Sequence, residues 1–163
     1  MSVIKYRDLK TIRKQFAGKV IVICSGVFDL THAGHVLFLE ECKKYGDILV
    51  VVVGDDVSVK EYKGGTRPLL NQYLRLKMVD SFKPVDYCFI GPKSKKPGLI
   101  FMEYVFNTLR PDIYVVNDDV PDLSERRATA KKFNIELKVL KRICPPEFKK
   151  ISTTKIIKKI KEL

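Results

Sequence analysis

The sequence has no long hydrophobic run, and this absence argues against a membrane-spanning protein. Its longest purely aliphatic run is Ile48 to Val53, whereas a helix needs roughly 20 apolar residues to cross a bilayer. The polar start MSVIKYRDLK also lacks the apolar core of a secretory signal. We therefore expect a cytoplasmic protein with no membrane insertion.

Paired cysteine motifs are also missing. The four cysteines, Cys24, Cys42, Cys88 and Cys144, are widely separated, with no CxxC pair and no histidine near them at metal-ligand spacing. Neither a zinc site nor a disulfide framework is indicated. We expect the cysteines to be small buried hydrophobic residues, and we assign no side chain of this chain as a metal ligand.

Acidic residues are the scarcer charge. The chain has 19 Asp plus Glu against 31 Lys plus Arg, a formal net charge of +12, which favours anionic partners without choosing among nucleic acid, membrane surface and nucleotide phosphates. No RNA-binding signature is present, and aromatic residues are not interleaved with the basic ones as a stacking platform requires. We therefore expect no nucleic-acid partner and keep a basic nucleic-acid-binding module only as an alternative of another class.

The remaining composition is that of one soluble globular domain, residues 1–163, with 45% hydrophobic and 31% charged residues. Short β-branched runs alternate with stretches of helical periodicity, which predicts a single Rossmann-like α/β domain: an open, mostly parallel five-stranded sheet with helices on both faces. Strands are expected at Val20 to Ser25, Ile48 to Gly54, Asp86 to Ile90, Asp112 to Val116 and Glu136 to Leu140. Helices are expected at Tyr6 to Ala17, Gly34 to Tyr45, Asn71 to Phe82, Leu99 to Leu109, Leu123 to Phe133 and Ser152 to Leu163.

Two helices carry patterns that predict which side they bury. In the helix at 71–82, Leu74, Met78 and Phe82 recur every four residues, so this stripe should lie on the sheet. In the last helix Ser152 is a natural N-cap, and we expect the apolar side chains to face the core, namely Ile156, Ile157, Ile160 and Leu163. The segments 55–70 and 91–98 are predicted to be irregular connections.

The turn after the first predicted strand is the strongest candidate site. Ligands of open α/β sheets bind at the carboxyl ends of the strands, beside the first strand, and this turn reads GVFDLTHAGH. It holds the only two histidines of the chain, His32 and His35, at the start of a helix. A helix N-terminus attracts anions, two imidazoles can donate to phosphate oxygens, and Gly34 would let the backbone approach them. Asp29 could bind Mg²⁺, but we favour a structural role in the turn.

This stretch resembles the signature of the cytidylyltransferase-like nucleotidyltransferases. Their HxGH element is matched by His32, Gly34 and His35, and their second signature, ISTT, is matched by the segment 151–154. The residues between, VLFLEECKKYGDILVVVVGDDVSVKEYKGGTRPLLNQYLRLKMV, are similar to the adenylyltransferase domain of ADP-heptose synthases and, less closely, to glycerol-3-phosphate cytidylyltransferases. The resemblance touches most of residues 20–163.

The resemblance implies an enzyme that transfers a nucleoside monophosphate from a nucleoside triphosphate to a phosphorylated small molecule and releases pyrophosphate. His32 and His35 would bind the triphosphate and stabilise the transition state. Lys63 is the better catalytic candidate of two loop lysines. The nucleotide-binding candidates are Gly26, Val27, Phe28, Gly34, Lys60, Arg75, Asn117, Asp119, Ser152, Thr153 and Thr154. Mg²⁺ is expected to accompany the triphosphate, and a homodimer is possible by analogy with relatives.

The acceptor and the base stay open at this point. The segment Val116 to Asp119, where relatives read both, matches neither the GDDW-like nor the KGGDY-like sequence of the two enzyme groups. Pro146 to Lys150, before ISTT, departs from the RTEG-like lead of cytidylyltransferases. A sugar (heptose) 1-phosphate with ATP is the first choice. CTP with glycerol 3-phosphate or a polyol or phosphocholine-like acceptor is the second, and adenylylation of FMN is the third.

Overall fold

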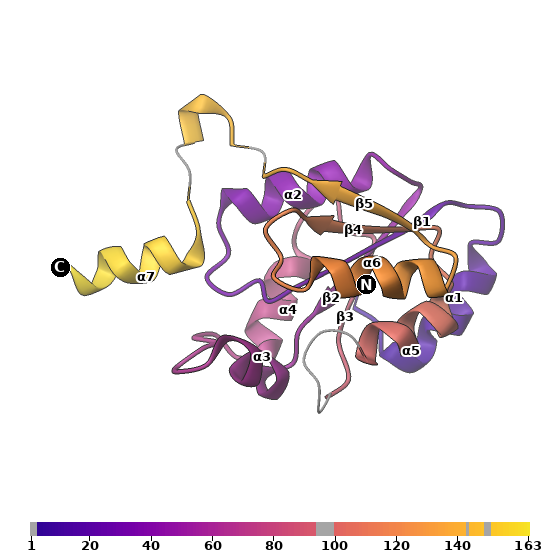
Figure 1. The fold of residues 1–163 in the computed structure, drawn as a ribbon, viewed down its shortest axis with the longest axis horizontal. Helices are drawn as coiled ribbons and strands as arrows, with labels where there is room; N and C mark the ends of the chain where they lie inside the picture. Colours follow the sequence, from indigo (N-terminus) through magenta and orange to yellow (C-terminus); the bar gives the residue numbers. More distant parts are fainter. Residues whose placement is uncertain (1–2, 94–99, 143, 149–150) are drawn as a thin grey trace.

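The fold is built on a parallel β-sheet, seen in a computed structural model that describes residues 3–93, 100–142, 144–148 and 151–163. Its five strands run in the order β3-β2-β1-β4-β5 (Figure 1). The predicted strands are all confirmed to within one residue at each end, at β1 Ile21–Gly26, β2 Ile48–Val53, β3 Tyr87–Ile90, β4 Ile113–Asn117 and β5 Glu136–Leu140. All four pairings are parallel, and the near-continuous apolar strands are typical of a sheet covered on both faces.

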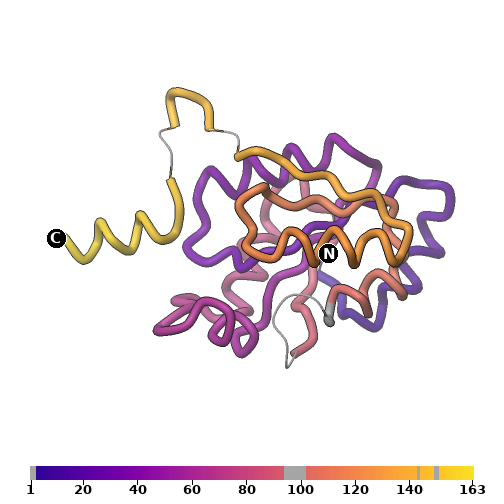
Figure 2. The backbone as a smooth tube through the Cα atoms, viewed as in Figure 1, coloured from indigo at the N-terminus to yellow at the C-terminus, as the bar shows by residue number. Residues whose placement is uncertain are grey.

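Helices cover both faces of this sheet, as predicted. The helical elements of the described residues are η1 Tyr6–Asp8, α1 Leu9–Gln15, α2 Ala33–Lys43, α3 Asp56–Lys63, α4 Gln72–Asp80, α5 Ile100–Leu109, α6 Leu123–Lys132, η2 Pro146–Phe148 and α7 Thr153–Lys161. One hydrophobic cluster joins α1, α5 and α6 to the sheet, and a second joins α2 and α4 to its other face. Figure 2 shows the same three layers as a backbone trace.

The helix α3 was not predicted, because it lies in the segment 55–70 that the sequence marks as irregular. Its N-cap is Asp55, whose carboxylate accepts a hydrogen bond of 3.0 Å from the Ser58 N–H. The rest of that segment, from Gly64 onward, is irregular as expected. Of the second predicted connection, residues 91–93 are irregular, and residues 94–98 lie outside the described residues.

Of the stripe predicted for the helix at 71–82, Phe82 packs on the core as expected, but α4 itself buries a different face. Leu74 is 52% exposed and Met78 is 42% exposed, whereas Leu76 and Val79 lie in the core. Arg75 is buried with them. Residues 74 and 78 have the same helical spacing as residues 75 and 79, so periodicity alone does not predict which pair is buried. The hydrogen bonds from Arg75 to backbone carbonyls favour burial of the face that carries residues 75 and 79.

Helix α7 begins as predicted but does not pack on the core. The Ser152 hydroxyl caps it by accepting from the Lys155 N–H at 3.3 Å. Beyond this first turn the helix leads away from the sheet (Figure 1), and Ile160 is 59% exposed while Leu163 is fully exposed. The predicted burial of the α7 isoleucines in the core is therefore wrong: no residue of α7 is buried.

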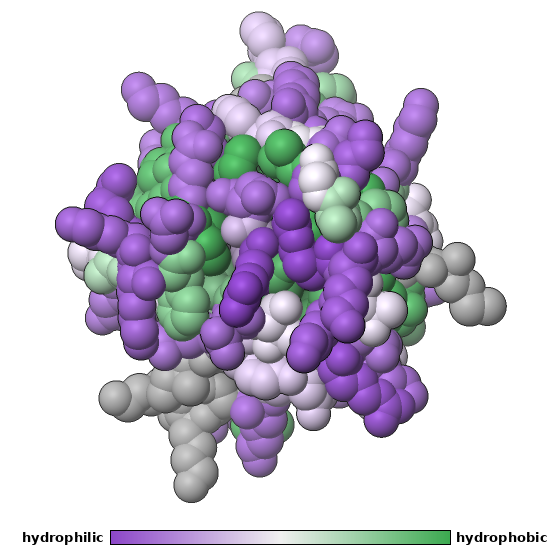
Figure 3. All heavy atoms as spheres, turned by 90° about the vertical axis from the view of Figure 1, so that its right-hand side faces the viewer, coloured by the Kyte–Doolittle hydropathy of each residue, from purple (hydrophilic) through white to green (hydrophobic). Residues whose placement is uncertain are grey.

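Among the described residues, no helix combines the length and apolar character that membrane crossing requires. Cys24, Cys42 and Cys88 are buried, as predicted, while Cys144 is exposed. Figure 3 views the molecule from the end where the strands begin; hydrophilic side chains dominate this face, with apolar ones visible between them. The candidate site lies at the opposite end of the sheet.

Candidate active site

A cavity of about 330 Å³ opens at the carboxyl ends of the strands. In the sheet order, β2 and β3 lie on one side of β1, and β4 and β5 lie on the other. Open α/β sheets form their binding crevice at the point where the strand order reverses in this way. The lining residues follow the ends of β1, β2, β3, β4 and β5 and also come from α3, α6 and the start of α7. One site therefore collects side chains from segments more than 100 residues apart.

The two histidines meet in this cavity. His32 is the N-cap of α2, and its ring centroid lies 4.1 Å from that of His35, with 33° between the ring planes. The backbone N–H of His32 donates to Nδ1 of His35 at 3.3 Å. In the neutral ring the proton therefore sits on Nε2 of His35. His35 is thus a hydrogen-bond donor through Nε2.

Both imidazoles are held neutral at physiological pH. Burial, followed by the charges of His32 and Arg142, lowers the pKa of His35 from 6.5 to about 4, against a smaller opposing effect of Asp29. Burial and Arg142 also lower the pKa of His32. Among the described residues, Nδ1 of His32 is buried without a hydrogen-bond partner. An unpaired buried polar atom costs about 1–3 kcal/mol, so a ligand at this atom would recover that cost.

Gly34 is required by the His32 ring. A Cβ at Gly34 would lie 3.0 Å from Cε1 and 3.1 Å from Nδ1 of His32, closer than side chains normally approach. The sequence suggested that this glycine lets the backbone approach phosphates. The structure adds that the absence of a side chain leaves room for an imidazole.

Asp29 has the structural role that the sequence favoured. Its buried carboxylate accepts from the backbone N–H groups of Leu69 and Leu70, each at 3.0 Å, and from Nε of Arg67 at 2.7 Å. These donors belong to the segment before α4 and not to the histidine turn itself. The Asp29 carbonyl in turn accepts from Oγ1 of Thr153 at 2.7 Å. Asp29 therefore joins the histidine turn to the ISTT segment.

The structure brings most of the predicted site residues to one cavity. Both histidines line it, as does Lys63, and the same holds for Gly26, Val27, Phe28, Gly34, Asn117, Asp119, Ser152, Thr153 and Thr154. The side chain of Asp119 accepts from Nε of Arg142 at 2.6 Å. Burial, followed by the charge of Arg67, lowers the pKa of Lys63, as expected for an ammonium group among other cations at a phosphate site.

Two predicted phosphate contacts do not reach the cavity. Lys60, one turn before Lys63 on α3, is exposed and is not among the residues that line the cavity. Arg75 is fully buried, and its guanidinium donates to the carbonyls of Val27 at 2.5 Å and Gly54 at 2.6 Å. It also donates to the Leu70 carbonyl and the Asp56 carboxylate, at 2.9 and 2.7 Å. The assignment of Arg75 to phosphate binding is corrected accordingly: its donors join three segments, those after β1 and β2 and the one before α4.

Sequence reasoning missed three arginines of the cavity, Arg67, Arg126 and Arg142. Arg142 follows β5, so the rule that sites form at strand ends could have found it. Arg67 lies in the connection 55–70, which was predicted only to be irregular. Arg126 sits inside the predicted helix at 123–133, where a solvated charge is the usual expectation, and nothing in the sequence distinguishes it from Arg127.

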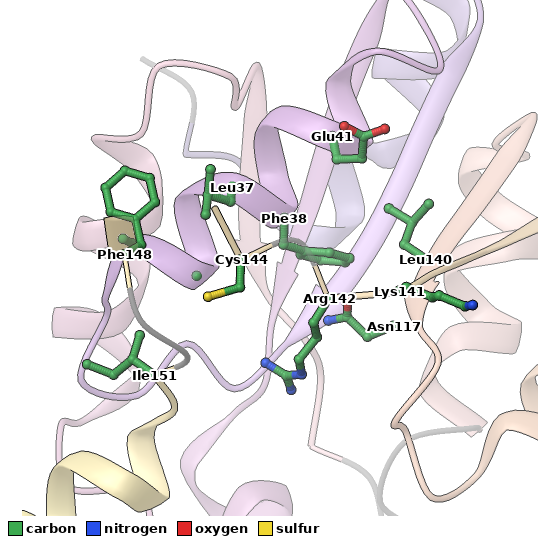
Figure 4. A pocket seen from close by; sticks show the side chains of 12 residues that line it. Leu37, Phe38, Glu41, Asn117, Leu140, Lys141, Arg142, Cys144, Phe148 and Ile151 are labelled. Atoms are coloured by element: carbon green, nitrogen blue, oxygen red, sulfur yellow. The ribbon is translucent and has the colours of Figure 1, made fainter. Parts of the chain in front are cut away.

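A narrower apolar cleft continues from this cavity. It lies between α2, the end of β5 and the residue before α7, and Leu37, Phe38, Leu140 and Ile151 contribute its apolar side chains (Figure 4). Four residues line both spaces, namely Gly34, Phe38, Asn117 and Arg142. A ligand can therefore extend from the histidine pair into the cleft.

Known proteins resemble the chain in sequence and in fold. The cytidylyltransferase-like family profile matches residues 23–159. An FAD synthase from Thermococcus sibiricus is 39% identical over 147 residues, covering 88% of this chain and 94% of that protein. The bifunctional protein HldE of Campylobacter jejuni subsp. doylei is 34% identical over 156 residues, which are 95% of this chain but 30% of HldE.

A solved structure is similar to this chain in both sequence and fold. The lipopolysaccharide core biosynthesis protein of Thermoplasma volcanium superposes with a TM-score of 0.63 at 32% identity, covering 78% of this chain and 99% of that one. The profile match spans both the histidine turn and the ISTT segment, and both segments line the same cavity. The chain belongs to the cytidylyltransferase-like family and is a nucleotidyltransferase.

Proposed function

We propose that this nucleotidyltransferase transfers AMP from ATP to FMN, which forms FAD and releases pyrophosphate. The match to the FAD synthase of Thermococcus sibiricus spans 94% of that protein, so it concerns a protein of similar extent. The match to HldE concerns 30% of a longer protein. This proposal raises FMN above the heptose 1-phosphate that the sequence favoured first.

The observation that carries the proposal is an apolar wall in the cavity. This wall consists of the apolar and aromatic lining residues from β2, α3, β4 and the segments after β3 and β4: Val52, Val59, Tyr62, Pro92, Val116 and Val120. A flat, largely apolar flavin ring buries well against such a wall. A heptose, with a hydroxyl group on most of its carbons, would leave many of those groups without partners there.

The nucleotide would occupy the other half of the site. The triphosphate would lie at the histidine pair, at Lys63, and at the N-termini of α2 and α7, where the helix dipole favours anions. The adenine would enter the cleft between Phe38 and Leu140, which continues from the phosphate region. This arrangement leaves the apolar wall free for the acceptor.

The chemistry follows from this placement. A phosphate oxygen of FMN attacks the α-phosphorus in line; the new O–P bond forms as the bond to the β-phosphate oxygen breaks, and the electron pair leaves with pyrophosphate. Neutral His35 donates through Nε2 to oxygens that gain charge in the transition state, with His32 beside it. No covalent enzyme intermediate is needed, because positioning and charge stabilisation account for this type of transfer.

We also propose that Mg²⁺ enters with the triphosphate. Among the described residues there is no cluster of three or more potential metal ligands. Of the three carboxylates that line the cavity, Asp29 and Asp119 are paired with arginines and Asp55 caps α3. A site of this kind fits a cation held mainly by phosphates and water. When bound, Mg²⁺ would neutralise charge on the leaving pyrophosphate.

A heptose 1-phosphate with ATP is the second candidate. The match to HldE covers 95% of this chain, and the Thermoplasma structure is named for lipopolysaccharide core biosynthesis. These likenesses concern the same residues as the likeness to FAD synthase, so they do not separate the two acceptors.

The test is a paired assay. The purified protein with Mg²⁺ receives ATP or CTP, together with FMN, heptose 1-phosphate or glycerol 3-phosphate, and pyrophosphate and FAD are measured. We expect pyrophosphate and FAD in equal amounts with ATP and FMN. Faster turnover of a sugar or polyol phosphate would overturn the proposal. The His35→Ala variant should lose about 100-fold or more in kcat, which ties the activity to this site.

A further inference from the structure

Arg126 is a buried cation in the cavity that the nucleotide half does not use. Its side chain is 12% exposed, and it lines the cavity from α6. The narrow cleft assigned to adenine does not include it. It is also separate from Arg142, which pairs with Asp119 and lowers the pKa of both histidines.

Three groups hold this guanidinium in place. Its Nε donates to Asp122, the N-cap residue of α6, at 2.8 Å. Its Nη1 donates to the buried hydroxyl of Tyr114 on β4 and lies 3.4 Å from Oγ of Ser25 on β1. These two strands are neighbours at the switch point of the sheet. The planar group is therefore fixed at the floor of the binding crevice before any ligand arrives.

Such a group is well suited to a phosphate. Burying a guanidinium is costly unless its donors are paired. The hydrogen bonds of Arg126 use Nε and Nη1, and among the described residues Nη2 has no partner. A fixed, weakly hydrated fork loses little entropy when it binds a phosphate and can bind it through two parallel hydrogen bonds.

The position of Arg126 indicates which phosphate. It lines the same cavity as Tyr62 and Val120, which belong to the apolar wall, and the charges of Asp122 and Arg126 act on the Tyr62 hydroxyl. The triphosphate has its own donors at the histidines and at α7. We propose that Arg126 binds the phosphomonoester group of the acceptor and that Tyr114 is a positioning residue for its guanidinium. This inference rests on the proposed transfer to a phosphorylated acceptor.

The test compares a ligand that has the phosphate with one that lacks it. FMN, riboflavin and the unreactive analogue α,β-methylene-ATP are titrated separately into the wild type, Arg126→Gln and Arg126→Lys by calorimetry. A lost charge-assisted hydrogen bond is worth about 1.5–3 kcal/mol, or roughly 10- to 150-fold in Kd. We expect Arg126→Gln to weaken FMN by that factor and to leave riboflavin and the ATP analogue within twofold. Arg126→Lys should fall between wild type and Arg126→Gln.

The matched control is Arg127→Gln, the next residue on α6, whose side chain is exposed; it should bind all three ligands like the wild type. Equal FMN affinity in Arg126→Gln and wild type would overturn the proposal. An equal loss of FMN and riboflavin would overturn it too, because it would indicate a purely structural role. If Arg126→Gln does not fold, the same titrations are made with Arg126→Lys and Tyr114→Phe. A loss of FMN affinity without a loss of riboflavin affinity supports the proposal, and an equal loss of both overturns it.

The two proposals fail separately. If the wild type turns over heptose 1-phosphate and not FMN, the proposed FMN acceptor is wrong. The Arg126 assignment is then decided by titrating heptose 1-phosphate against heptose. If the wild type turns over neither acceptor, the acceptor class is refuted and the assignment of Arg126 with it.

Discussion

Replacing Arg75 tests whether this residue stabilises the fold or binds phosphate. The family resemblance implied a phosphate contact, whereas the structure shows a fully buried guanidinium whose donors reach the loops after β1 and β2 and the segment before α4. We predict that Arg75→Met lowers the free energy of unfolding strongly. Methionine has similar length and is apolar, so the change removes the charge and the donors while keeping most of the volume.

The size of the effect follows from the groups left behind. Three carbonyl oxygens and the partly exposed Asp56 carboxylate, 38% exposed, lose their donor. Removing one member of a buried ion pair costs about 3–5 kcal/mol. Each carbonyl left unsatisfied would cost about 1–3 kcal/mol, although these costs are not additive and water can relieve some of them. We therefore expect a loss of about 4 kcal/mol, a large part of the 5–15 kcal/mol that a domain typically has.

Urea unfolding followed by circular dichroism measures this loss, and the KM for ATP is measured on the folded variant at low temperature. The control is Lys77→Met, on the same helix, where the Lys77 side chain is 74% exposed and pairs with Asp80; it should change stability by less than about 0.5 kcal/mol. A loss below 1 kcal/mol for Arg75→Met, together with a tenfold rise in the KM for ATP, would refute the structural role.

Three further predictions concern the histidine turn and α3. Because burial lowers the pKa of His35 from 6.5 to about 4, the unfolded chain takes up a proton between these values. The free energy of unfolding should therefore fall by up to about 3 kcal/mol as the pH drops from 6.5 to 4; His35→Gln should lose this part of the pH dependence in urea titrations. Gly34→Ala should displace the His32 ring and lower kcat by at least tenfold with little change in unfolding, since alanine favours the helix; an unchanged kcat contradicts this. Lys63→Ala should lower kcat/KM by roughly 10- to 150-fold, whereas Lys60→Ala, on the same helix but exposed, should stay within twofold; equal effects would contradict the placement.

Much of the architecture could be predicted from the sequence. The strands β1 and β2 could be predicted from their apolar runs, because a parallel strand covered on both faces is apolar along most of its length. The histidine turn could be found for a similar reason. A site at the end of the first strand is set by the order of elements along the chain, and its residues lie within one short segment.

Contacts between distant segments could not be predicted in the same way. The sequence predicted that α4 is a helix, but it did not predict that Arg75 is buried and Leu74 is exposed. The carbonyls that accept the hydrogen bonds of Arg75 come from three other loops, which lie far from it in the sequence or in the segment just before the helix. The core packing expected for α7 failed for the same reason: an amphipathic pattern predicts an apolar face but not what lies beside it.

By itself, then, the sequence determined the strands, the order of the layers and the histidine turn, since each depends on residues close together in the chain. Only the tertiary structure decided which cations face the cavity. Lys63 and Lys60 share a helix, and Arg126 and Arg127 are adjacent, yet only Lys63 and Arg126 line the site. That choice depends on how each helix is rotated against the sheet, which is fixed by packing and hydrogen bonds across segments far apart in the chain.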